Sequence, residues 1–302
     1  MQPRIIGIVC KDAGAANQIA HYILNNPGNH IFALQEPALS IFTSILGSVE
    51  NLKLQEIVKA SSEVITGSGW TSDFELEGIQ MAQKNGKKAV THLDHWNNYL
   101  RRFTRHSELI LPNEFWVSDE YSYNIASELF KGKDIVRKTD YYLQYQVKSV
   151  KNLKKAIVNP VDEKETNVLF LSEPLIAYSE SGEVQRSDDG HTLELEFISL
   201  IKNAGIKYLE TRIRPHPSEI RRKSTLQGLN ISVSDTSTTP LSNDLAWADI
   251  VIGIDSYALF VSDNAGIPTV SVSCWIGREM TIPRGRVKSL QKDKLIEFLR
   301  AK

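Results

Sequence analysis

The sequence is poor in cysteine, in net charge and in long apolar runs, and each lack excludes a class of protein. Its two cysteines, Cys10 and Cys274, lie far apart and belong to no C-x-x-C or Cys/His cluster, so neither a disulfide framework nor a structural zinc site is expected. Its 35 lysines and arginines nearly balance its 36 aspartates and glutamates. The net charge therefore gives no argument for a nucleic-acid partner.

Membrane insertion and export are not predicted either. No apolar run approaches the ~18–20 residues that span a bilayer. The chain enters a predicted strand at Arg4–Cys10 without a charged-then-apolar signal segment. We expect no transmembrane segment and a cytoplasmic location, with peripheral association at the inner face of the membrane left open. With 302 residues, of which 41% are hydrophobic, the chain is long enough for two medium-sized domains with real cores.

Two common patterns of nucleotide chemistry are also missing. The loop Asp12–Asn17, which follows the first predicted strand, has neither G-x-G-x-x-G nor the Walker pattern. No D-x-D stands in a predicted strand-end loop, because Asp249 and Asp255 are too widely spaced. Phosphate chemistry in this chain is therefore expected to need no metal, with fixed dipoles and a cationic group bearing the charge of the leaving group.

Short apolar runs alternate with segments of helical spacing, which predicts βαβ units and parallel sheets. The polar segment Asn159–Glu165 separates two such series, so we predict two Rossmann-like domains, at 1–160 and 161–302. The helical run Gln291–Ala301 is expected to pack back on the first domain. The predicted strands are Arg4–Cys10, His30–Leu34, Glu63–Gly67, Lys88–Leu93, Leu109–Leu111, Glu114–Val117, Asn167–Leu171, Tyr208–Arg212, Asn230–Val233 and Pro268–Ser273. The predicted helices are Gln18–Leu24, Ser40–Leu46, Glu75–Asn85, Ser122–Phe130, Tyr141–Ala156, Thr192–Ala204 and Tyr257–Gly266.

The most informative stretch lies in the second half. Thr211–Pro217 (TRIRPHP) and Ala248–Ser256 (ADIVIGIDS) each predict a buried strand that opens into a polar loop, and ligands collect at such strand ends in open α/β sheets. Ser256 directly precedes a predicted helix, and a helix N-terminus beside a hydroxyl suits a phosphate. Two neighbouring loops of this kind predict a diphosphate or nucleotide site, although each alone is compatible with an ordinary strand end.

The order of these motifs resembles a known half-domain. RPHP, a gap of about forty residues, ADxVIGxxS and then xxGIPxV are similar to the donor-binding domain of GT-B glycosyltransferases, over roughly residues 166–275. The resemblance points especially to bacterial enzymes that use CMP-activated sialic acid, Kdo or related acids. It extends to glycerophosphate-polymer transferases and, more distantly, to the UDP-GlcNAc 2-epimerase fold. It implies an α/β protein whose two Rossmann-like domains face a cleft, with the acceptor domain first and the nucleotide-sugar donor domain second.

The second half offers a set of candidate donor-binding residues. His216 is expected to donate a hydrogen bond to the donor phosphate, Arg214 to supply charge and Ser256 to add a hydroxyl. Asp235 or Asp244 is a candidate for binding the ribose hydroxyls. The other candidates share a position at a predicted strand end: Gly253, Ser172 and Glu173.

In the first half, the end of the strand Lys88–Leu93 is followed by Asp94, His95 and Trp96. A carboxylate or imidazole can accept a proton from an attacking hydroxyl, and the tryptophan is a candidate wall for a sugar ring. The resemblance favours Asp94, because an aspartate of the N-terminal domain does this work in sialyltransferases of this fold. That family has an acidic pair followed by glycine, whereas this sequence has Asp94, His95 and Trp96 at the same place. The alternative is a solvated helix start, with Asp94 as N-cap and Trp96 as a packing residue.

Two more strand-end loops are candidates for binding the acceptor. Gly14 in the loop Asp12–Asn17 allows close backbone approach, and Asn17 would cap the next helix or bind an acceptor. The loop Gly67–Ser72 supplies hydroxyls and backbone freedom, although it is also compatible with an ordinary βα turn. The candidate acceptor-binding residues are Asp12, Gly14, Asn17, Ser68, Trp70 and Trp96.

Together these features predict a metal-independent, inverting glycosyltransferase without a cofactor. It would move an acidic sugar (sialic acid, Kdo or a related nonulosonate) from a CMP donor to a cell-surface glycan acceptor. Asp94 or His95 would deprotonate the acceptor, while His216 and Ser256 stabilise the departing phosphate. Two alternatives remain open: a sugar-nucleotide epimerase or hydrolase of UDP-GlcNAc 2-epimerase-like fold, which would turn over without an acceptor, and a non-catalytic protein that binds a sugar nucleotide.

Overall fold

The computed structural model describes residues 4–70, 72–156, 165–173, 175, 191–206, 209–216, 231–283 and 285–301. The chain divides into two compact units, Met1–Gln144 and Tyr145–Lys302, and the division falls inside helix α7 (Tyr141–Ala156). The predicted boundary near residue 160, with most of the predicted linker, lies outside the described residues. No helix in these ranges is both long and apolar enough to cross a membrane.

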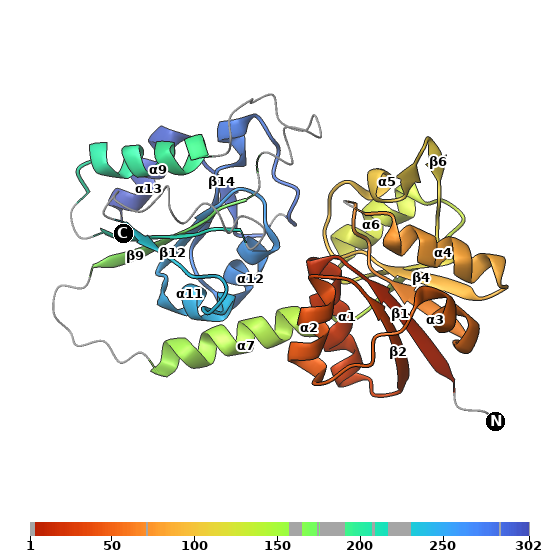
Figure 1. The fold of residues 1–302 in the computed structure, drawn as a ribbon. Helices are drawn as coiled ribbons and strands as arrows, with labels where there is room; N and C mark the ends of the chain where they lie inside the picture. Colours follow the sequence, from red (N-terminus) through yellow and green to blue (C-terminus); the bar gives the residue numbers. More distant parts are fainter. Residues whose placement is uncertain are drawn as a thin grey trace. The chain divides into compact units, whose positions relative to one another are not determined.

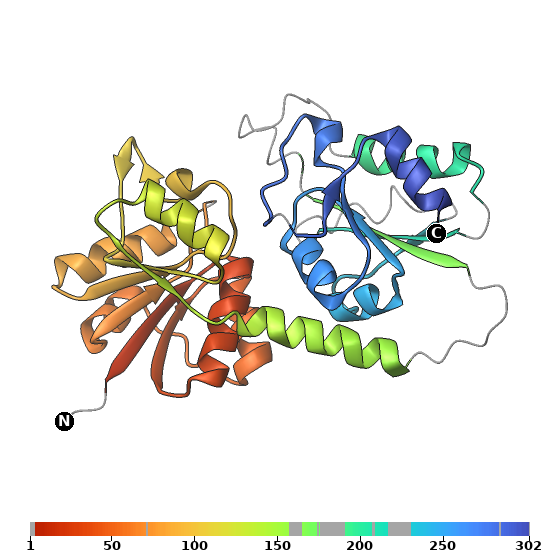
Figure 2. The same cartoon turned by 180° about the vertical axis from the view of Figure 1, so that it is seen from behind.

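Strands and helices alternate along the first unit (Figures 1 and 2). Its strands are β1 (Ile5–Cys10), β2 (Asn29–Leu34), β3 (Glu63–Thr66), β4 (Lys88–His92), β5 (Thr104–Arg105), β6 (Glu108–Leu109), β7 (Glu114–Val117) and β8 (Asp134–Arg137). Its helices are α1 (Ala13–Asn25), α2 (Ala38–Leu46), α3 (Leu54–Ala60), α4 (Phe74–Lys84), α5 (Tyr99–Arg102) and α6 (Glu120–Leu129), and α7 follows.

The main sheet of this unit is parallel and has the strand order β2-β1-β3-β4-β7-β8. Strands β5 and β6 form a separate antiparallel pair. The chain passes from β1 to β2 on one side and then returns to β3 on the other side of β1, so the strand order reverses between β1 and β3. Ligands of open parallel sheets bind at the carboxyl ends of the strands at such a switch point.

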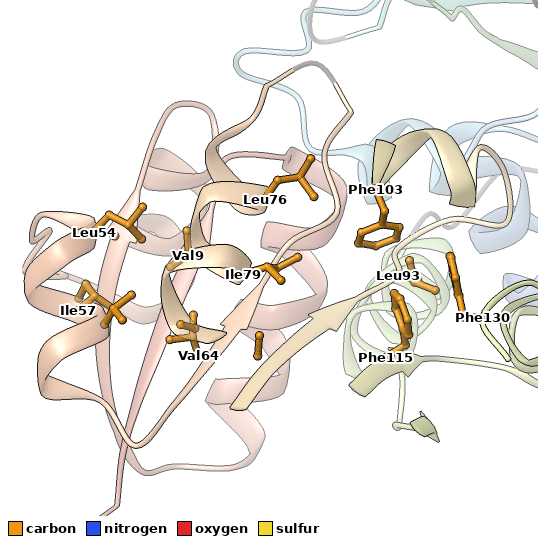
Figure 3. Close-up of a cluster of buried hydrophobic side chains, with 14 of the residues drawn as sticks. Val9, Leu54, Ile57, Val64, Leu76, Ile79, Leu93, Phe103, Phe115 and Phe130 are labelled. Atoms are coloured by element: carbon orange, nitrogen blue, oxygen red, sulfur yellow. The ribbon is translucent and has the colours of Figure 1, made fainter. Parts of the chain in front are cut away.

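Both faces of this sheet are buried. Neighbouring residues of a strand point to opposite faces, and here the residues of both faces belong to core clusters. Val9 and Phe115 belong to a core cluster under α3, α4 and α6 (Figure 3). Their neighbours Ile8 and Trp116 belong to a second cluster under α1 and α2. Phe115 also stacks on Phe130, with ring centroids 4.3 Å apart. Strands packed on both faces hold their carboxyl ends in fixed positions.

The second unit repeats this plan. Its described strands are β9 (Thr166–Leu171), β10 (Leu209–Arg214), β11 (Ser232–Val233), β12 (Ile250–Gly253), β13 (Thr269–Ser271) and β14 (Lys288–Ser289). Its described helices are α9 (His191–Asn203), α11 (Leu241–Trp247), α12 (Tyr257–Ala265), the 3-10 helix η2 (Ser273–Ile276) and α13 (Lys292–Arg300). The sheet is again parallel, with the order β11-β10-β9-β12-β13-β14. Its order therefore reverses between β9 and β12.

Helices α9 and α13 cover one face of the second sheet, and α11 and α12 cover the other (Figures 1 and 2). Phe170 of β9 stacks on Phe197 of α9, and Leu295 and Leu299 of α13 lie in the same core cluster. We expected this C-terminal helix to pack back on the first unit. Its two buried apolar residues, Leu295 and Leu299, are one turn apart and pack instead in the core of the second unit. They form a narrow apolar stripe on the helix.

Candidate functional site

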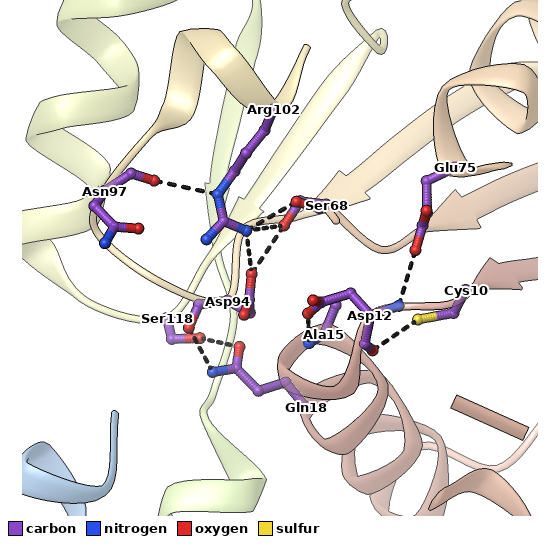
Figure 4. A network of polar contacts seen from close by, with 10 residues as sticks. All are labelled: Cys10, Asp12, Ala15, Gln18, Ser68, Glu75, Asp94, Asn97, Arg102 and Ser118. Carbon is purple, nitrogen blue, oxygen red and sulfur yellow. Dashed lines mark hydrogen bonds and ion pairs between the residues drawn. The ribbon is translucent and has the colours of Figure 1, made fainter. Parts of the chain in front are cut away.

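In the first unit, polar side chains gather at the carboxyl ends of four adjacent strands (Figure 4). Asp12 follows β1, Ser68 follows β3, Asp94 follows β4 and Asp119 follows β7. Three of these, from segments far apart in the sequence, are predicted site residues. The structure therefore brings predicted residues of the first half together at the expected edge of the sheet.

The Asp94 carboxylate is held by two donors. Arg102 Nη1 donates to Asp94 Oδ1 at 2.6 Å, and Ser68 Oγ donates to the same oxygen at 2.9 Å. Arg102 Nη1 also lies 2.8 Å from the Ser68 carbonyl oxygen, and Arg102 Nε donates to the Asn97 carbonyl oxygen at 3.2 Å. The guanidinium is only 5% exposed, and a charge so buried is tolerated when it is paired and hydrogen-bonded. The network thus fixes both the position and the charge of Asp94.

Asp12 is held from two sides at the other end of this cluster. Its Oδ2 atom accepts a hydrogen bond from the Ala15 amide at 3.0 Å and so caps helix α1. The Glu75 carboxylate accepts from the Lys11 amide at 2.7 Å and from the Asp12 amide at 3.0 Å. Helix α4, which carries Glu75, therefore fixes the backbone of the loop after β1.

Gly14 separates the two aspartates. A Cβ atom at this position would overlap Asp94 Oδ2 and lie 3.2 Å from Asp12 Oδ2. The two carboxyl groups therefore flank the same backbone position, where only glycine leaves room for both. In the structure, the group that closely approaches Gly14 is the carboxyl of Asp94.

The two aspartates titrate in opposite directions. Burial, together with the negative charge of Asp94, raises the pKa of Asp12 to about 7. Burial would also raise the pKa of Asp94, but the positive charges of Arg102 and His95 and the hydrogen bond from Ser68 outweigh it and lower the pKa. Below about pH 7 the cluster thus favours a protonated Asp12 beside an ionised Asp94, which is the arrangement of an acid–base pair.

The raised pKa of Asp12 predicts a pH-dependent gain in stability on its replacement. A carboxyl whose pKa rises on folding contributes stability that is fully present below about 3.8 and is lost as the pH rises through about 7. Asparagine keeps the helix cap but carries no charge. Asp12→Asn should therefore raise the free energy of unfolding at pH 8 by on the order of 1–3 kcal/mol, and by almost nothing at pH 4. Urea unfolding at the two pH values checks this, and equal differences would contradict it.

The segment after Asp94 departs from the predicted helix start and from the predicted aromatic wall, but Trp96 is a packing residue as the alternative predicted. Helix α5 begins only at Tyr99, after Asn98 in the left-handed region at φ 59°, so Asp94 is not its N-cap. Trp96 is 6% exposed, and its Nε1 donates to Asp119 Oδ2 at 2.7 Å. The ring therefore packs inside the unit and is not an open wall for a sugar. His92, at the end of β4, is also buried, and burial lowers its pKa to about 4.

One further acceptor-side prediction changes with the structure. Asn17 was expected to cap a helix starting at Gln18, but α1 already starts at Ala13 with Asp12 as its cap. Asn17 instead lies inside the helix, where its Nδ2 donates to the Ala13 carbonyl oxygen at 2.8 Å. Trp70 stays partly exposed, with the Arg101 guanidinium 4.4 Å from its ring centroid.

In the second unit, two buried hydroxyls stand at the switch point of the sheet. Ser172 follows β9, and Ser256 follows β12 and precedes α12. Neither hydroxyl oxygen has a hydrogen-bond partner among the described residues. A buried polar atom without a partner costs free energy, so its presence calls for a ligand or another explanation. His216 follows β10, the neighbour of β9, so the three predicted residues lie at adjacent strand ends.

Other predicted donor-side residues have partners inside the protein. Glu173 Oε1 accepts from the Asp255 amide at 2.5 Å, which joins the loops after β9 and β12. Asp255 in turn accepts from the Thr281 amide at 2.8 Å and from the Thr281 hydroxyl at 2.6 Å. These contacts fix the segment that follows η2 beside the N-terminus of α12.

The charge of Arg214, which was expected at the donor phosphate, is already paired. Its Nη1 atom donates to Asp244 Oδ2 at 2.5 Å, and Asp244 is fully buried and not open to a ribose. Asp235 Oδ1 accepts from the Ser237 amide at 3.0 Å in a local turn. A Cβ atom on Gly253 would lie 3.2 Å from both Leu171 and Leu259, so this glycine serves the packing of α12 on the sheet.

Two residues of the first-unit network had no predicted role, Arg102 and Glu75. Arg102 follows Asp94 at a distance of eight residues in the sequence. A cation at that spacing is only a weak indication of an ion pair with the aspartate. From the sequence, Glu75 is an acid whose charge stabilises the N-terminus of α4. Its hydrogen bonds to the loop after β1 join segments far apart in the sequence, and no local pattern predicts them. Within the described residues, no group of three or more His, Cys, Asp or Glu side chains is arranged to hold a metal ion.

No family model and no curated protein sequence matches this chain. Among solved structures, the chain is similar to the UDP-GlcNAc 2-epimerase of Methanocaldococcus jannaschii in complex with UDP-GlcNAc and UDP, with a TM-score of 0.66 at 12% identity, over 99% of this chain and 93% of that one. The Neisseria meningitidis UDP-GlcNAc 2-epimerase bound to UDP-GlcNAc gives 0.62 at 12% identity, over 98% and 90%. The wall teichoic acid polymerase TagF, in a crystal soaked with CDPG, gives 0.56 at 12% identity, over 99% and 79%.

These similarities at low identity show the fold. The chain is an α/β protein of two parallel-sheet units of the GT-B class, as predicted. The neighbours are epimerases and a polymerase, and they give no specific support to the sialyltransferase or Kdo-transferase resemblance.

Proposed function

We propose that this chain is an enzyme that acts on a UDP-sugar without a sugar acceptor, as an epimerase or a hydrolase. The observation that carries the proposal is the pair Asp12 and Asp94, which flank Gly14 and whose pKa values are shifted in opposite directions. An epimerase or hydrolase was the alternative to the glycosyltransferase that the sequence mainly predicted.

The chemistry of the pair supports epimerisation or hydrolysis over transfer. Inverting a carbon that bears a hydrogen requires one group to remove a proton and another to return one, and hydrolysis similarly uses a base for water and an acid for the leaving group. Ionised Asp94 would be the base and protonated Asp12 the acid. An inverting transferase needs only the base from the protein, so a retained proton on Asp12 would have no task.

The second unit supports a diphosphate. The hydroxyls of Ser172 and Ser256 lie at the switch point of the sheet, and the nine-residue helix α12 begins directly after Ser256. Phosphate oxygens would satisfy both hydroxyls and interact with the N-terminal amides of that helix. His216, at the next strand end, is the proposed hydrogen-bond donor to the departing phosphate.

Charge at the first-unit site disfavours an acidic sugar. Three carboxyl groups, those of Asp12, Glu75 and Asp94, lie together with one buried cation, Arg102, which is paired with Asp94. A sugar carboxylate would add a like charge in a poorly solvated place, which costs free energy. The similarity to UDP-GlcNAc 2-epimerases likewise supports an uncharged sugar on UDP rather than an acidic sugar on CMP.

A panel of UDP- and CMP-sugars incubated without acceptor tests the proposal. We expect an uncharged UDP-sugar to be converted to an epimer, or to UDP and free sugar, as followed by anion-exchange chromatography. Turnover of a CMP-linked acidic sugar only after a glycan acceptor is added would favour the transferase. Binding without turnover across the panel would favour a non-catalytic protein.

The unpartnered hydroxyl of Ser256 gives a sharper test of the nucleotide site. Because no described residue bonds to it, Ser256→Ala should leave the free energy of unfolding unchanged or slightly raised. If a phosphate bonds to it, the same change should weaken UDP binding about tenfold, as measured by calorimetry. Ser262→Ala is the matched control on the same helix, because Ser262 Oγ bonds to Thr269 at 2.7 Å. It should lower stability and leave the affinity for UDP unchanged.

A further inference from the structure

Glu75 is inserted between the loops that follow β1 and β3. It lies in the first turn of α4, is 1% exposed, and accepts the amides of Lys11 and Asp12. A Cβ atom on either Gly67 or Gly69 would lie 3.4 Å from its Oε1 atom. The backbone of the second loop therefore lies within contact distance of this carboxyl.

The charge of Glu75 is not needed for these hydrogen bonds. Its second oxygen, Oε2, is buried and has no hydrogen-bond partner among the described residues. A glutamine would accept the same two amides through its carbonyl oxygen and would avoid the larger cost of burying a carboxylate. The presence of an acid at this position therefore calls for a role of its charge.

We propose that Glu75 is a positioning residue for the acid of the reaction proposed above. It fixes the loop after β1, so that the Asp12 carboxyl stays across Gly14 from Asp94, and its negative charge favours the protonated form of Asp12. The inference rests on the proposed function for its effect on turnover, but not for its effect on Asp12.

Electrostatics agrees with this geometry. Burial and the charge of Asp94 are the largest causes of the raised pKa of Asp12, and the charge of Glu75 adds to them. Burial raises the pKa of Glu75 as well, and its two amide hydrogen bonds oppose that rise. The charged groups that act on Asp12 include two acids, Asp94 and Glu75, and one cation, Arg102, and the Cys10 thiol lies beside its backbone.

Glu75→Gln and Glu75→Ala separate the two parts of the role. Glu75→Gln keeps the amide bonds, so kcat at the optimum should stay within about threefold, while the loss of turnover at high pH should begin about half a pH unit lower. Glu75→Ala removes the bonds, so kcat should fall about tenfold or more with KM little changed. Glu77→Gln is the control, because Glu77 lies in the same helical turn and is exposed.

A titration without substrate decides the charge effect independently of turnover. In protein labelled with ¹³C at aspartate carboxyls, the Asp12 signal is assigned by its loss in Asp12→Asn. Its midpoint should move to lower pH in Glu75→Gln and stay in place in Glu77→Gln. An unmoved midpoint in Glu75→Gln would overturn the charge role, and full turnover in Glu75→Ala would overturn the positioning role. If Glu75→Ala does not fold, the Glu75→Gln titration still decides the proposal. If the wild-type chain turns over no nucleotide sugar, the proposed function fails while the titration result stands.

Discussion

Asp94→Asn should lower turnover of the nucleotide sugar by about 10²–10⁴-fold, while UDP binding stays within about twofold. The substitution keeps the shape of the side chain and its contact with Ser68, but an amide cannot accept the proton that the proposed base removes. Steady-state kinetics and calorimetry with UDP measure the two effects on the same protein. Because the proposed nucleotide-binding residues lie in the second unit, loss of the proposed base should change kcat and not the affinity for UDP.

Asp119→Asn is the matched control for this variant. Asp119 stands at the next strand end, where it caps α6 and accepts a hydrogen bond from Trp96. Its replacement should reduce stability modestly and change kcat by no more than about threefold. If Asp119→Asn is inactive while Asp94→Asn keeps its turnover, the base has been assigned to the wrong strand end.

Arg102→Met should lower the free energy of unfolding by about 3–5 kcal/mol, because it leaves the Asp94 carboxylate in a largely buried place without its counter-ion. The double variant Arg102→Met, Asp94→Leu removes both charges and should recover much of this loss while remaining inactive. Urea unfolding of the single and double variants measures the coupling between the two residues.

Arg101→Met provides the control beside it in sequence. The Arg101 guanidinium is exposed and lies over the ring of Trp70, so its loss should lower stability by less than about 1 kcal/mol. If Arg102→Met is no less stable than Arg101→Met, Asp94 does not depend on a buried ion pair for its charge.

Local patterns were sufficient to predict most of the fold. The apolar runs that became β1, β4, β9 and β12 are buried on both faces, and such runs are recognisable without knowledge of their partners. Strand β8 was missed because its residues, Asp134–Arg137, are partly exposed and carry charges at both ends. Helix α3 was missed because it has only seven residues.

The residues of the candidate site could be predicted from sequence only in part, and the reason is physical. Rules for strand ends pointed to Asp12, Ser68, Asp94 and Ser256, because those rules depend only on the order of elements. The partners of these residues depend on contacts between distant segments. Neither the pairing of Arg214 with Asp244 nor the contact of Glu75 with the loop after β1 has a local signal.

The proposed class of sugar also has no local signal in the sequence. The motifs of the second half resemble a donor domain, and they led to an acidic sugar on CMP. The electrostatic character of the first-unit site depends on Asp12, Glu75 and Asp94 lying together, although they are spread over more than eighty residues of sequence. Only the assembled cluster shows that a second anion would be disfavoured there.

The most direct test of the proposed acid–base pair is to incubate the chain with UDP-GlcNAc in D₂O, without an acceptor, and to follow the sugar by proton NMR. We predict either an epimer with deuterium at the inverted carbon, or UDP and free sugar, and no conversion by Asp12→Asn or Asp94→Asn. Unchanged UDP-GlcNAc with the wild-type chain, together with turnover of a nucleotide sugar only when a glycan acceptor is present, would contradict the account.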